Sequence, residues 1–395
     1  MPARRESGVY RVDHGMNQRI TIVGGGIVGA ACARTLARAG ARVTVVETRF
    51  PGGGATAAGM GHVVVMDDSP PQLAITTRSR DLWHTLAEEL PAEAEWRRTG
   101  TLWVAADDDE LAEAARKRDL LATAGVAARL LDAAALAAAE PHLRLGLAGG
   151  LLVPDDGVVY PPPVAAWLLA AAARDGARLI RDTTVVAVAG DGLAAGSVRL
   201  ADGRTLPGDA VVVAAGTATP RLVPGAPLRP RKGHLVITDR VPGFATHQLI
   251  ELGYVKRAHD VGTDSVAFNV QPRSTGQLLV GSSRQVDVDS RDIDRAILRQ
   301  MLDRCREYMP DLAAVPAIRT WTGVRAATPD GLPLIGPWPE LPGVWLATGH
   351  EGLGITTSLG TAELVAHGLC GTATPLDPLP FLPARFAVAE VASHG

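Results

Sequence analysis

Near the start of the chain, the pattern of apolar residues predicts a strand, a helix and a second strand in direct succession. The stretches 20–23 and 42–46 are rich in β-branched residues, which is typical of strands buried in a parallel sheet. Between them, residues 27–39 form an apolar helical run that ends before Gly40, a residue type favoured just after a helix. A glycine-rich turn joins the first strand to this helix, so the three elements predict a βαβ unit.

Further along, helical and strand-like patterns alternate. Residues 99–125 predict a strand followed by a charged amphipathic helix, and residues 162–176 predict an apolar helix followed by another strand. From 234 to 316, runs such as DSVAFNVQP and GQLLVGSS alternate apolar and polar positions before a helix over 291–309. This second region indicates a mixed, largely antiparallel sheet.

Composition and charge narrow the range of functions. A chain of 395 residues with 47% apolar content has enough core for two domains, and its net charge of −3 offers no basic stripe for a nucleic acid. The three cysteines, Cys32, Cys305 and Cys370, have neither disulfide nor metal-ligand spacing, so we expect no metal site. No apolar stretch is long enough to span a bilayer, and we expect a cytoplasmic protein. Residues 1–16 are expected to be a disordered leader or an over-called start.

The first glycine turn has the spacing of a dinucleotide-binding site. Gly24, Gly26 and Gly29 fit G-x-G-x-x-G: the first makes the turn, the second admits a pyrophosphate and the third allows close packing of helix and strand. Glu47 ends the second strand, where a carboxylate hydrogen-bonds the ribose hydroxyls. A glutamate at this point favours NAD or FAD over NADP.

The sequence after Glu47 distinguishes FAD from NAD. Instead of further strand and helix units, the chain continues into TRFPGGGATAAGMGHVVV, whose small residues let the backbone pass close to a flat ligand. Much later, a fully apolar strand over 210–214 ends in Ala215 and Gly216, and no second G-x-G-x-x-G follows for a separate nicotinamide domain. These features favour FAD, with a plain NAD-binding protein as the alternative.

Five motifs together resemble one enzyme family. VGGGIVG, GATAAGMG, RKGH, GVRAATPDGLPLIG and GHEGLGITTSLG occur in this order between residues 23 and 360. In order and spacing the chain is similar to the D-amino-acid oxidase superfamily, in the branch of glycine oxidase, sarcosine oxidase, the hydrogen cyanide synthase flavin subunit and D-hydroxyproline dehydrogenase. The resemblance implies an α/β two-domain flavoprotein, in which a Rossmann-like FAD-binding domain is interleaved with a mixed, largely antiparallel substrate-binding sheet domain.

The resemblance also implies domain limits and cofactor contacts. It places the FAD-binding domain at 17–85, 151–230 and 317–386, and the substrate-binding domain at 86–150 and 231–316. The residues implied to contact FAD are Gly24, Gly26, Ile27, Val28, Gly29, Glu47, Thr48, Arg49, Thr56, Ala58, Gly59, Met60, Gly61, Val185, Ala215, Gly216, Gly352, Leu353, Gly354 and Ile355.

The second glycine cluster, at Gly352 and Gly354, stands just before a predicted helix. These glycines allow close backbone approach, and a helix starting near Ile355 would direct its N-terminal N–H groups at the flavin edge that gains negative charge on reduction. Relatives that link the flavin covalently have a cysteine where this chain has Gly323. We therefore expect the FAD to be held non-covalently.

Arg325 is the candidate for holding the substrate. Enzymes of this family hold an amino acid by its carboxylate, which a guanidinium recognises with two parallel hydrogen bonds. Arg325 matches the position of the carboxylate-binding arginine in glycine oxidase and its relatives, while a salt bridge to Asp330 is the structural alternative. Lys232, in RKGH, is a second substrate-binding candidate, and an ordinary strand residue is its alternative.

Five further residues are candidates for the substrate site. Asn269 stands where glycine oxidase has a tyrosine, and Tyr254 either supplies a pocket hydroxyl instead or is an ordinary surface or core tyrosine. His62 and His350 flank the expected flavin site and either contact flavin or substrate or serve as structural histidines. Glu351 either pairs with a substrate amine or with Arg325, or caps the next helix.

The leading functional hypothesis is oxidation of a small secondary or D-configured amino acid to its imine, with a D-hydroxyproline-like imino acid as the first substrate class. Glycine, sarcosine, iminodiacetate-like N-substituted glycines and opines remain open, as does oxidation of a 2-hydroxy acid. The electron acceptor is oxygen or an electron-transfer partner such as a quinone. In a further hypothesis the chain is the flavin subunit of a hetero-oligomeric dehydrogenase; a homo-oligomer is also open.

Overall fold

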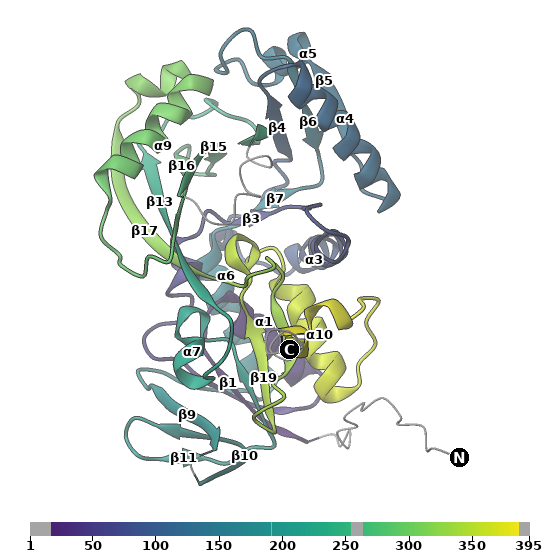
Figure 1. Ribbon diagram of the computed structural model, residues 1–395, viewed down its shortest axis with the longest axis vertical. Helices are drawn as coiled ribbons and strands as arrows, with labels where there is room; N and C mark the ends of the chain where they lie inside the picture. The colour runs from purple at the N-terminus through teal and green to yellow at the C-terminus, as the bar shows by residue number, and fades with distance from the viewer. Residues whose placement is uncertain (1–16, 191, 254–263, 387–395) are drawn as a thin grey trace, which may run out of the picture.

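Two large β-sheets organise the chain in the computed structural model, which describes residues 17–190, 192–253 and 264–386. In Figure 1 a six-stranded sheet with its helices fills the lower half, and an eight-stranded sheet fills the upper half. Each sheet draws its strands from both the first and the second half of the sequence. The expected α/β architecture with a second, largely antiparallel sheet is therefore confirmed.

The six-stranded sheet is parallel except at one edge. Its strand order is β18-β19-β12-β1-β2-β8, and only the β18–β19 pair is antiparallel. Ile22 pairs with Val212 on one side and Val45 on the other, so the centre of the sheet is largely apolar, with Thr21 and Thr44 as a polar pair beside them. The strands are β1 (Arg19–Val23), β2 (Arg42–Val46), β8 (Arg178–Ile180), β12 (Ala210–Val213), β18 (Leu334–Pro337) and β19 (Val344–Thr348).

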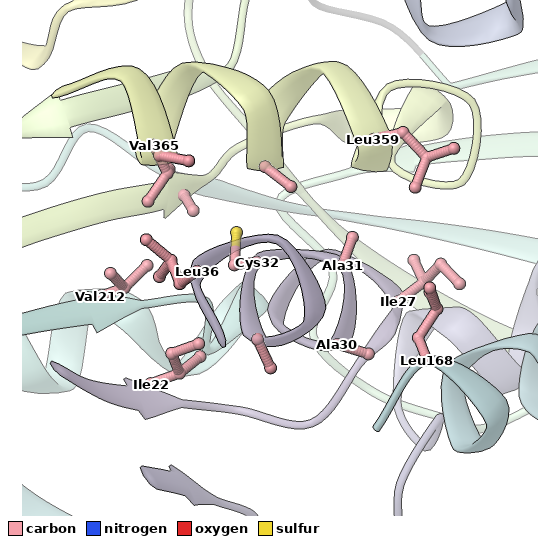
Figure 2. Close-up of a cluster of buried hydrophobic side chains, with 14 of the residues drawn as sticks. Ile22, Ile27, Ala30, Ala31, Cys32, Leu36, Leu168, Val212, Leu359 and Val365 are labelled. Atoms are coloured by element: carbon pink, nitrogen blue, oxygen red, sulfur yellow. The ribbon is translucent and has the colours of Figure 1, made fainter. Parts of the chain in front are cut away.

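Helix α1 (Ile27–Arg38) lies at the centre of the largest apolar cluster. It packs against α6 (Pro161–Arg174) and α10 (Ser358–Cys370), and α10 in turn contacts α3 (Pro70–Ala87). Figure 2 shows Leu36 of α1 between Val365 and Val212. Small residues such as Ala30 and Cys32 bring the helix close to its neighbours, which fixes its N-terminus at the end of β1.

The eight-stranded sheet has the order β17-β13-β16-β15-β14-β4-β6-β5. All of its neighbours are antiparallel except β14 and β4. Its strands are β4 (Thr101–Ala105), β5 (Arg129–Asp132), β6 (Gly149–Val153), β13 (Arg229–Thr238), β14 (Gln248–Glu251), β15 (Ser265–Pro272), β16 (Leu278–Val286) and β17 (Ala317–Ala327).

In the part of the chain that the structure describes, three helices accompany this sheet, and each begins at a side-chain cap. Asp107, Asp132 and Asp294 accept hydrogen bonds from first-turn N–H groups of α4 (Asp108–Thr123), α5 (Ala133–Ala139) and α9 (Arg295–Tyr308). Helix α9 contacts β15 and β16, where Met301, Cys305 and Tyr308 join a buried apolar cluster.

The remaining elements are short. They are α2 (Ala55–Ala58), β3 (His62–Val63), β7 (Gly157–Val158), β9 (Val185–Gly190), β10 (Leu193–Leu200), β11 (Thr205–Leu206), α7 (Thr219–Leu222) and the 3₁₀ turns η1 (Ala92–Ala94), η2 (Gly216–Ala218), η3 (Pro310–Ala314), η4 (Glu351–Leu353), η5 (Leu379–Phe381) and η6 (Pro383–Phe386). Within the described ranges, no helix combines the length and the hydropathy needed to cross a bilayer.

One expected domain limit differs from the course of the sheets. Residues 317–327 were assigned above to the FAD-binding domain, but they form β17, which pairs along its whole length with β13 in the eight-stranded sheet. The edge position of β17 brings the two sheets together near Ala58, the residue that lies against Gly323. We propose that the last domain boundary lies after Ala327.

Candidate active site

Two glycines of the first glycine turn stand where a side chain would not fit. Gly24 has a φ of +109°, and a Cβ there would lie 2.5 Å from the carbonyl oxygen of Ala214. A Cβ on Gly29 would lie 2.0 Å from the carbonyl oxygen of Gly24. Both clashes are with backbone atoms, so these glycines are required for helix α1 to start directly beneath the end of β1.

The N-terminus of α1 is suited to a diphosphate. Gly26 at the N-cap provides no side-chain cap, and the Ile27 N–H donates to Thr56 Oγ1 at 3.0 Å. Glu47 stands beside the turn and accepts from the N–H groups of Gly25, at 2.7 Å, and Arg49, at 2.9 Å. A helix terminus whose N-cap is a glycine, with the carboxylate of Glu47 beside it, fits the dinucleotide half of FAD.

The other residues expected at the nucleotide end surround the same turn. Thr48 follows Glu47 directly, Val28 lies in the first turn of α1, and Val185 is buried at the start of β9. Ala215 lies next to Gly24, and the Cβ position of Gly216 faces open space.

A cavity of about 370 Å³ lies where several segments that are distant in the sequence meet. One wall is the loop containing Ala58, Gly59, Met60 and Gly61, in which a Cβ on Gly61 would lie 1.9 Å from the carbonyl oxygen of Val159. The other walls come from β13, β16 and β17 and from residues 351–355. A cavity of this size between two glycine-rich loops fits the ring system of a flavin together with a small substrate.

The second glycine cluster is arranged differently from the sequence expectation. Gly352, Leu353 and Ile355 line the cavity, but η4 forms first and the α-helix α10 begins only at Ser358. The expected helix start near Ile355 is therefore wrong by three residues. The 3₁₀ turn η4 holds the backbone of Gly352 and Leu353 at the cavity, in the place where the sequence predicts the N-terminus of a helix.

Arg325 faces the cavity from β17. Its Nη2 donates to the carbonyl oxygen of Ser283 at 2.9 Å, and among the described residues no carboxylate oxygen lies within 4 Å of its guanidinium nitrogens. Asp330, the alternative partner, pairs with Arg385 at 2.7 Å instead. The remaining N–H donors of Arg325 therefore bind neither of the two nearby acids, Asp330 and Glu351.

Glu351 is held by two other arginines of the cavity wall. Its Oε1 lies 3.1 Å from Arg231 Nη1 and 3.0 Å from Arg284 Nη2. Burial disfavours the charged form of Glu351, but the charges of Arg284, Arg325 and Arg231 hold its pKa below the ordinary value. Its φ of +48° places a non-glycine residue in the left-handed region, a strained conformation that these ion pairs stabilise.

Two further residues expected at the substrate site line the same cavity. Asn269 is buried, and its Oδ1 has no hydrogen-bond partner within the described part of the chain. The same holds for Nε2 of His62. Burial lowers the pKa of His62 to about 4, so its imidazole is neutral at neutral pH. Both side chains present polar atoms that a bound ligand would satisfy.

The structure does not bring every predicted residue into the cavity. His350 lies behind the wall, where its Nε2 lies 2.9 Å from Thr361 Oγ1 and burial lowers its pKa to about 4. Lys232 points away from the cavity, with its Nζ 3.4 Å from Ser290 Oγ. Gly354 packs against His350 instead of lining the cavity. Tyr254 lies outside the described residues.

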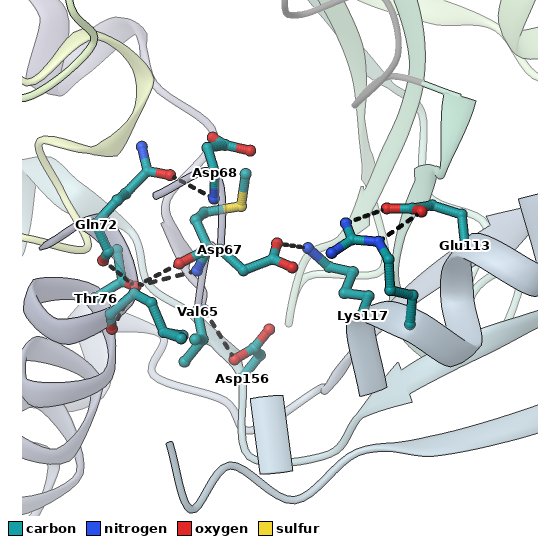
Figure 3. A network of polar contacts seen from close by, with 11 residues as sticks. Val65, Asp67, Asp68, Gln72, Thr76, Glu113, Lys117 and Asp156 are labelled. Carbon is teal, nitrogen blue, oxygen red and sulfur yellow. Dashed lines mark hydrogen bonds and ion pairs between the residues drawn. The ribbon is translucent and has the colours of Figure 1, made fainter. Parts of the chain in front are cut away.

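A polar network anchors the segment that leads from β3 to α3 along the cavity. Figure 3 shows Asp67 paired with Lys117, and Asp156 accepting from the N–H of Val65 at 3.2 Å. Thr76 Oγ1 accepts a hydrogen bond from the Met66 N–H at 3.1 Å. Burial raises the pKa of Asp156 to about 7, although the Thr101 hydroxyl and nearby cations oppose the shift.

Sequence reasoning missed Arg231 and Arg284. In RPRKGH, two basic residues are adjacent, and alternation along a strand lets only one of them face a given side. Arg231 pairs in register with Arg325, which places both on the cavity side, while Lys232 pairs with Val324. Gly233 also lines the cavity, and residues two apart on a strand face the same side. The spacing between Arg231 and Gly233 was therefore the signal in the sequence that could have identified Arg231.

Known proteins share this arrangement over almost the whole chain. Residues 19–367 match the family described as FAD dependent oxidoreductase. Glycine oxidase from Geobacillus kaustophilus (strain HTA426) is 30% identical over 375 residues, covering 92% of this chain and 95% of that protein. Hydrogen cyanide synthase subunit HcnC from Pseudomonas aeruginosa is 30% identical over 416 residues, covering 93% and 96%. The crystal structure of glycine oxidase from Geobacillus kaustophilus, 28% identical, superposes with a TM-score of 0.83 and covers 94% of this chain and 99% of that one. The chain therefore belongs to the family of FAD-dependent oxidoreductases.

Proposed function

We propose that this enzyme oxidises the CH–NH bond of a small amino acid to the imine. The observation that carries the proposal is Arg325, which faces the cavity without a carboxylate partner among the described residues. A guanidinium in this setting recognises a carboxylate by two parallel hydrogen bonds. It lies beside the two glycine-rich loops against which a flavin ring fits.

FAD, when bound, supplies the acceptor for the two electrons and the hydrogen that leave the substrate. The protein's own contribution is position and protonation state. Arg325 fixes the carboxylate, and His62 and Asn269 offer a neutral imidazole and an amide to the amine. The neutral imidazole of His62 keeps a free lone pair, which can accept a hydrogen bond or a proton from the substrate amine.

The flavin is proposed to be held without a covalent bond. Gly323 lies against Ala58 at the cavity, at a place where no thiol is available. Cys32 and Cys305 are buried elsewhere, and burial raises the pKa of each thiol to about 12, so neither forms a reactive thiolate.

Among substrates, the sequence favours a secondary or D-configured amino acid, with D-hydroxyproline or D-proline as the first class. The two relatives named above, a glycine oxidase and a hydrogen cyanide synthase subunit, support amino-acid chemistry at this site. Because the second is a subunit of a larger assembly by name, we propose both oxygen and an electron-transfer partner as acceptors to be tested.

An anaerobic reduction experiment tests this proposal. The purified yellow protein is mixed with D-hydroxyproline, D-proline, glycine, sarcosine or iminodiacetate, and in parallel with the corresponding 2-hydroxy acids. The flavin absorbance is followed in each mixture. We expect amino acids to bleach the flavin. If only 2-hydroxy acids bleach it, the amine proposal fails and the hydroxy-acid alternative replaces it.

A further inference from the structure

We propose that the substrate carries a second carboxylate, which binds at Arg231 while the α-carboxylate binds at Arg325. This inference rests on the proposed function, because it takes Arg325 as the site of the α-carboxylate. Among the amino acids proposed above, this inference therefore favours those with two carboxylates over the proline class. The class of substrate is a dicarboxylic amino acid of short span, such as an N-carboxyalkyl amino acid of the iminodiacetate or opine type, or a D-configured acidic amino acid.

The two arginines are direct neighbours across strands. Arg231 on β13 pairs in register with Arg325 on β17, and both line the cavity. Residues opposite each other in an antiparallel pair have Cβ atoms only about 5 Å apart, where two like charges destabilise the sheet unless anions lie between or beside them. A wall built in this way favours a ligand that brings negative charge to both positions.

Arg231 has binding capacity that the protein itself leaves unused. The residue is 8% exposed, and its Nε has no hydrogen-bond partner within the described residues. Among residues 17–190, 192–253 and 264–386, its one carboxylate contact is with Oε1 of Glu351, which also lies 3.0 Å from Arg284. One oxygen shared between two guanidinium groups leaves Arg231 incompletely neutralised, and a buried cation in that state is costly.

The other acids that line the cavity do not replace a ligand. Asp330 is exposed and pairs with Arg385, and Asp68 is exposed at the rim. Solvent screens both of these carboxylates, whereas Arg231 lies inside the wall. The buried part of the cavity therefore has an excess of positive charge on Arg231 and Arg325.

Glu351 separates the two binding positions. It is fixed in its strained conformation by ion pairs to Arg231 and Arg284, and its single charge also acts on Arg325, so one carboxylate faces three guanidinium groups. A monocarboxylate at Arg325 leaves Arg231 as it is. A second carboxylate on a short chain reaches Arg231 and completes its hydrogen bonds, with Asn269 on the same wall as a further donor.

Matched ligand pairs that differ by one carboxylate test the inference. Sarcosine and iminodiacetate are compared in anaerobic flavin bleaching, as are D-alanine and D-aspartate. Binding without turnover is measured with methoxyacetate and diglycolate, ether analogues that lack the amine, by the shift of the flavin absorbance. We expect the dicarboxylate of at least one amine pair to react at least about 10-fold more efficiently, and diglycolate to bind more tightly than methoxyacetate.

Substitutions locate the second carboxylate. Arg231→Gln should reduce each dicarboxylate preference, measured as the ratio of dicarboxylate to monocarboxylate efficiency within the same variant, by about 10- to 100-fold. Arg231→Lys keeps the charge and should retain an intermediate preference. If Arg231→Gln folds without flavin, Arg231→Lys is used for the test in its place. Arg229→Gln, on the same strand but exposed and paired with Asp287, is the control and should leave both preferences unchanged.

The outcomes separate this inference from the proposed function. If monocarboxylates bleach the flavin as well as dicarboxylates do, or if neither Arg231 variant alters the preference, the second carboxylate site is wrong and the amino-acid proposal stands. If no amino acid of either kind bleaches the flavin, both fail.

Discussion

The nucleotide end and the substrate end of this enzyme are built on opposite principles. At the nucleotide end, a glycine turn and the start of α1 present backbone N–H groups, and Glu47 and Arg49 are the charged residues expected to contact the ligand. At the substrate end, charged side chains from three strands of the other sheet face the cavity. The first end depends on steric room and the second on charge balance, so substitutions at the two ends should fail in different ways.

The largest effect is expected from closing the nucleotide end. Gly29→Ala places a Cβ 2.0 Å from the Gly24 carbonyl oxygen, a clash between backbone and side chain that small shifts do not relieve. We expect the protein to purify without flavin, measured as the ratio of absorbance at 450 and 280 nm.

The control for this substitution lies in the same βαβ unit. Gly40 has a φ of +88°, but nothing lies within 4 Å of its Cβ position. Gly40→Ala should therefore cost only about 1 kcal/mol of stability and keep the flavin. Equal flavin content in both variants would contradict the steric account of the turn.

The second effect concerns the carboxylate contact at the substrate end. Arg325→Ala should lower the rate of flavin bleaching per unit substrate concentration by about 10²- to 10³-fold, because a buried charge pair with the substrate is lost. Arg325→Lys should lose less, since it keeps the charge without the bidentate geometry. The flavin content should stay normal in both variants.

Arg319→Ala is the matched control for Arg325, because it lies on the same strand β17 and is exposed. Its kinetics should equal those of the unaltered enzyme. If Arg325→Ala behaves like Arg319→Ala, Arg325 does not hold the substrate.

The third effect tests the charge balance of the arginine wall. Glu351→Gln removes the carboxylate shared by Arg231 and Arg284, and we expect a loss of about 2 kcal/mol in the free energy of unfolding. A bound dicarboxylate such as diglycolate should restore more of the melting temperature in this variant than in the unaltered enzyme.

Glu363→Gln provides the comparison, because Glu363 is similarly buried and pairs with Arg78 at 2.6 Å, outside the cavity lining. Diglycolate should raise the melting temperature of that variant no more than it does for the unaltered enzyme. An equal extra gain in both variants would show that the effect does not come from the cavity.

The last effect, which lies outside both ligand ends, is a pH dependence of stability at Asp156. Burial raises the pKa of this carboxyl to about 7 in the folded protein, above the ordinary value of 3.8. The folded state therefore binds more protons than the unfolded state between these pH values, and the stability from this group falls as the pH rises, by at most about 1.4 kcal/mol per pH unit.

Asp156→Asn removes this titration. The melting temperature of the variant relative to the unaltered protein should increase between pH 5 and pH 8. A constant difference over this range would mean that Asp156 does not hold its proton in the folded state.

The comparison of the two ends also explains what the sequence could predict. The βαβ unit is contiguous, so Gly24, Gly29 and Glu47 could be assigned from spacing alone. The arginine wall depends on the pairing of β13 with β16 and β17, which are separated by dozens of residues. The local pattern of apolar and polar residues does not show which strands pair. The sequence therefore indicated Lys232 as a substrate-binding residue, although its neighbour Arg231 is the one that faces the cavity.

The turn at Glu351 is a second example of tertiary contacts determining local structure. A glutamate with φ of +48° before a glycine-rich stretch is not favoured by its own propensity. The ion pairs to Arg231 and Arg284 stabilise it, and the chain makes a 3₁₀ turn before α10 begins at Ser358. The helix start could not be read correctly without those distant partners.

A single-turnover experiment tests the central claim most directly. The enzyme is mixed anaerobically with its best amino acid, and the quenched mixture is analysed by mass spectrometry while the flavin absorbance is recorded. The account predicts one amino acid converted to its imine, or to the carbonyl product of hydrolysis, for each flavin bleached, and a slower conversion in Arg325→Ala. Bleaching by 2-hydroxy acids with no amino acid oxidised would contradict it.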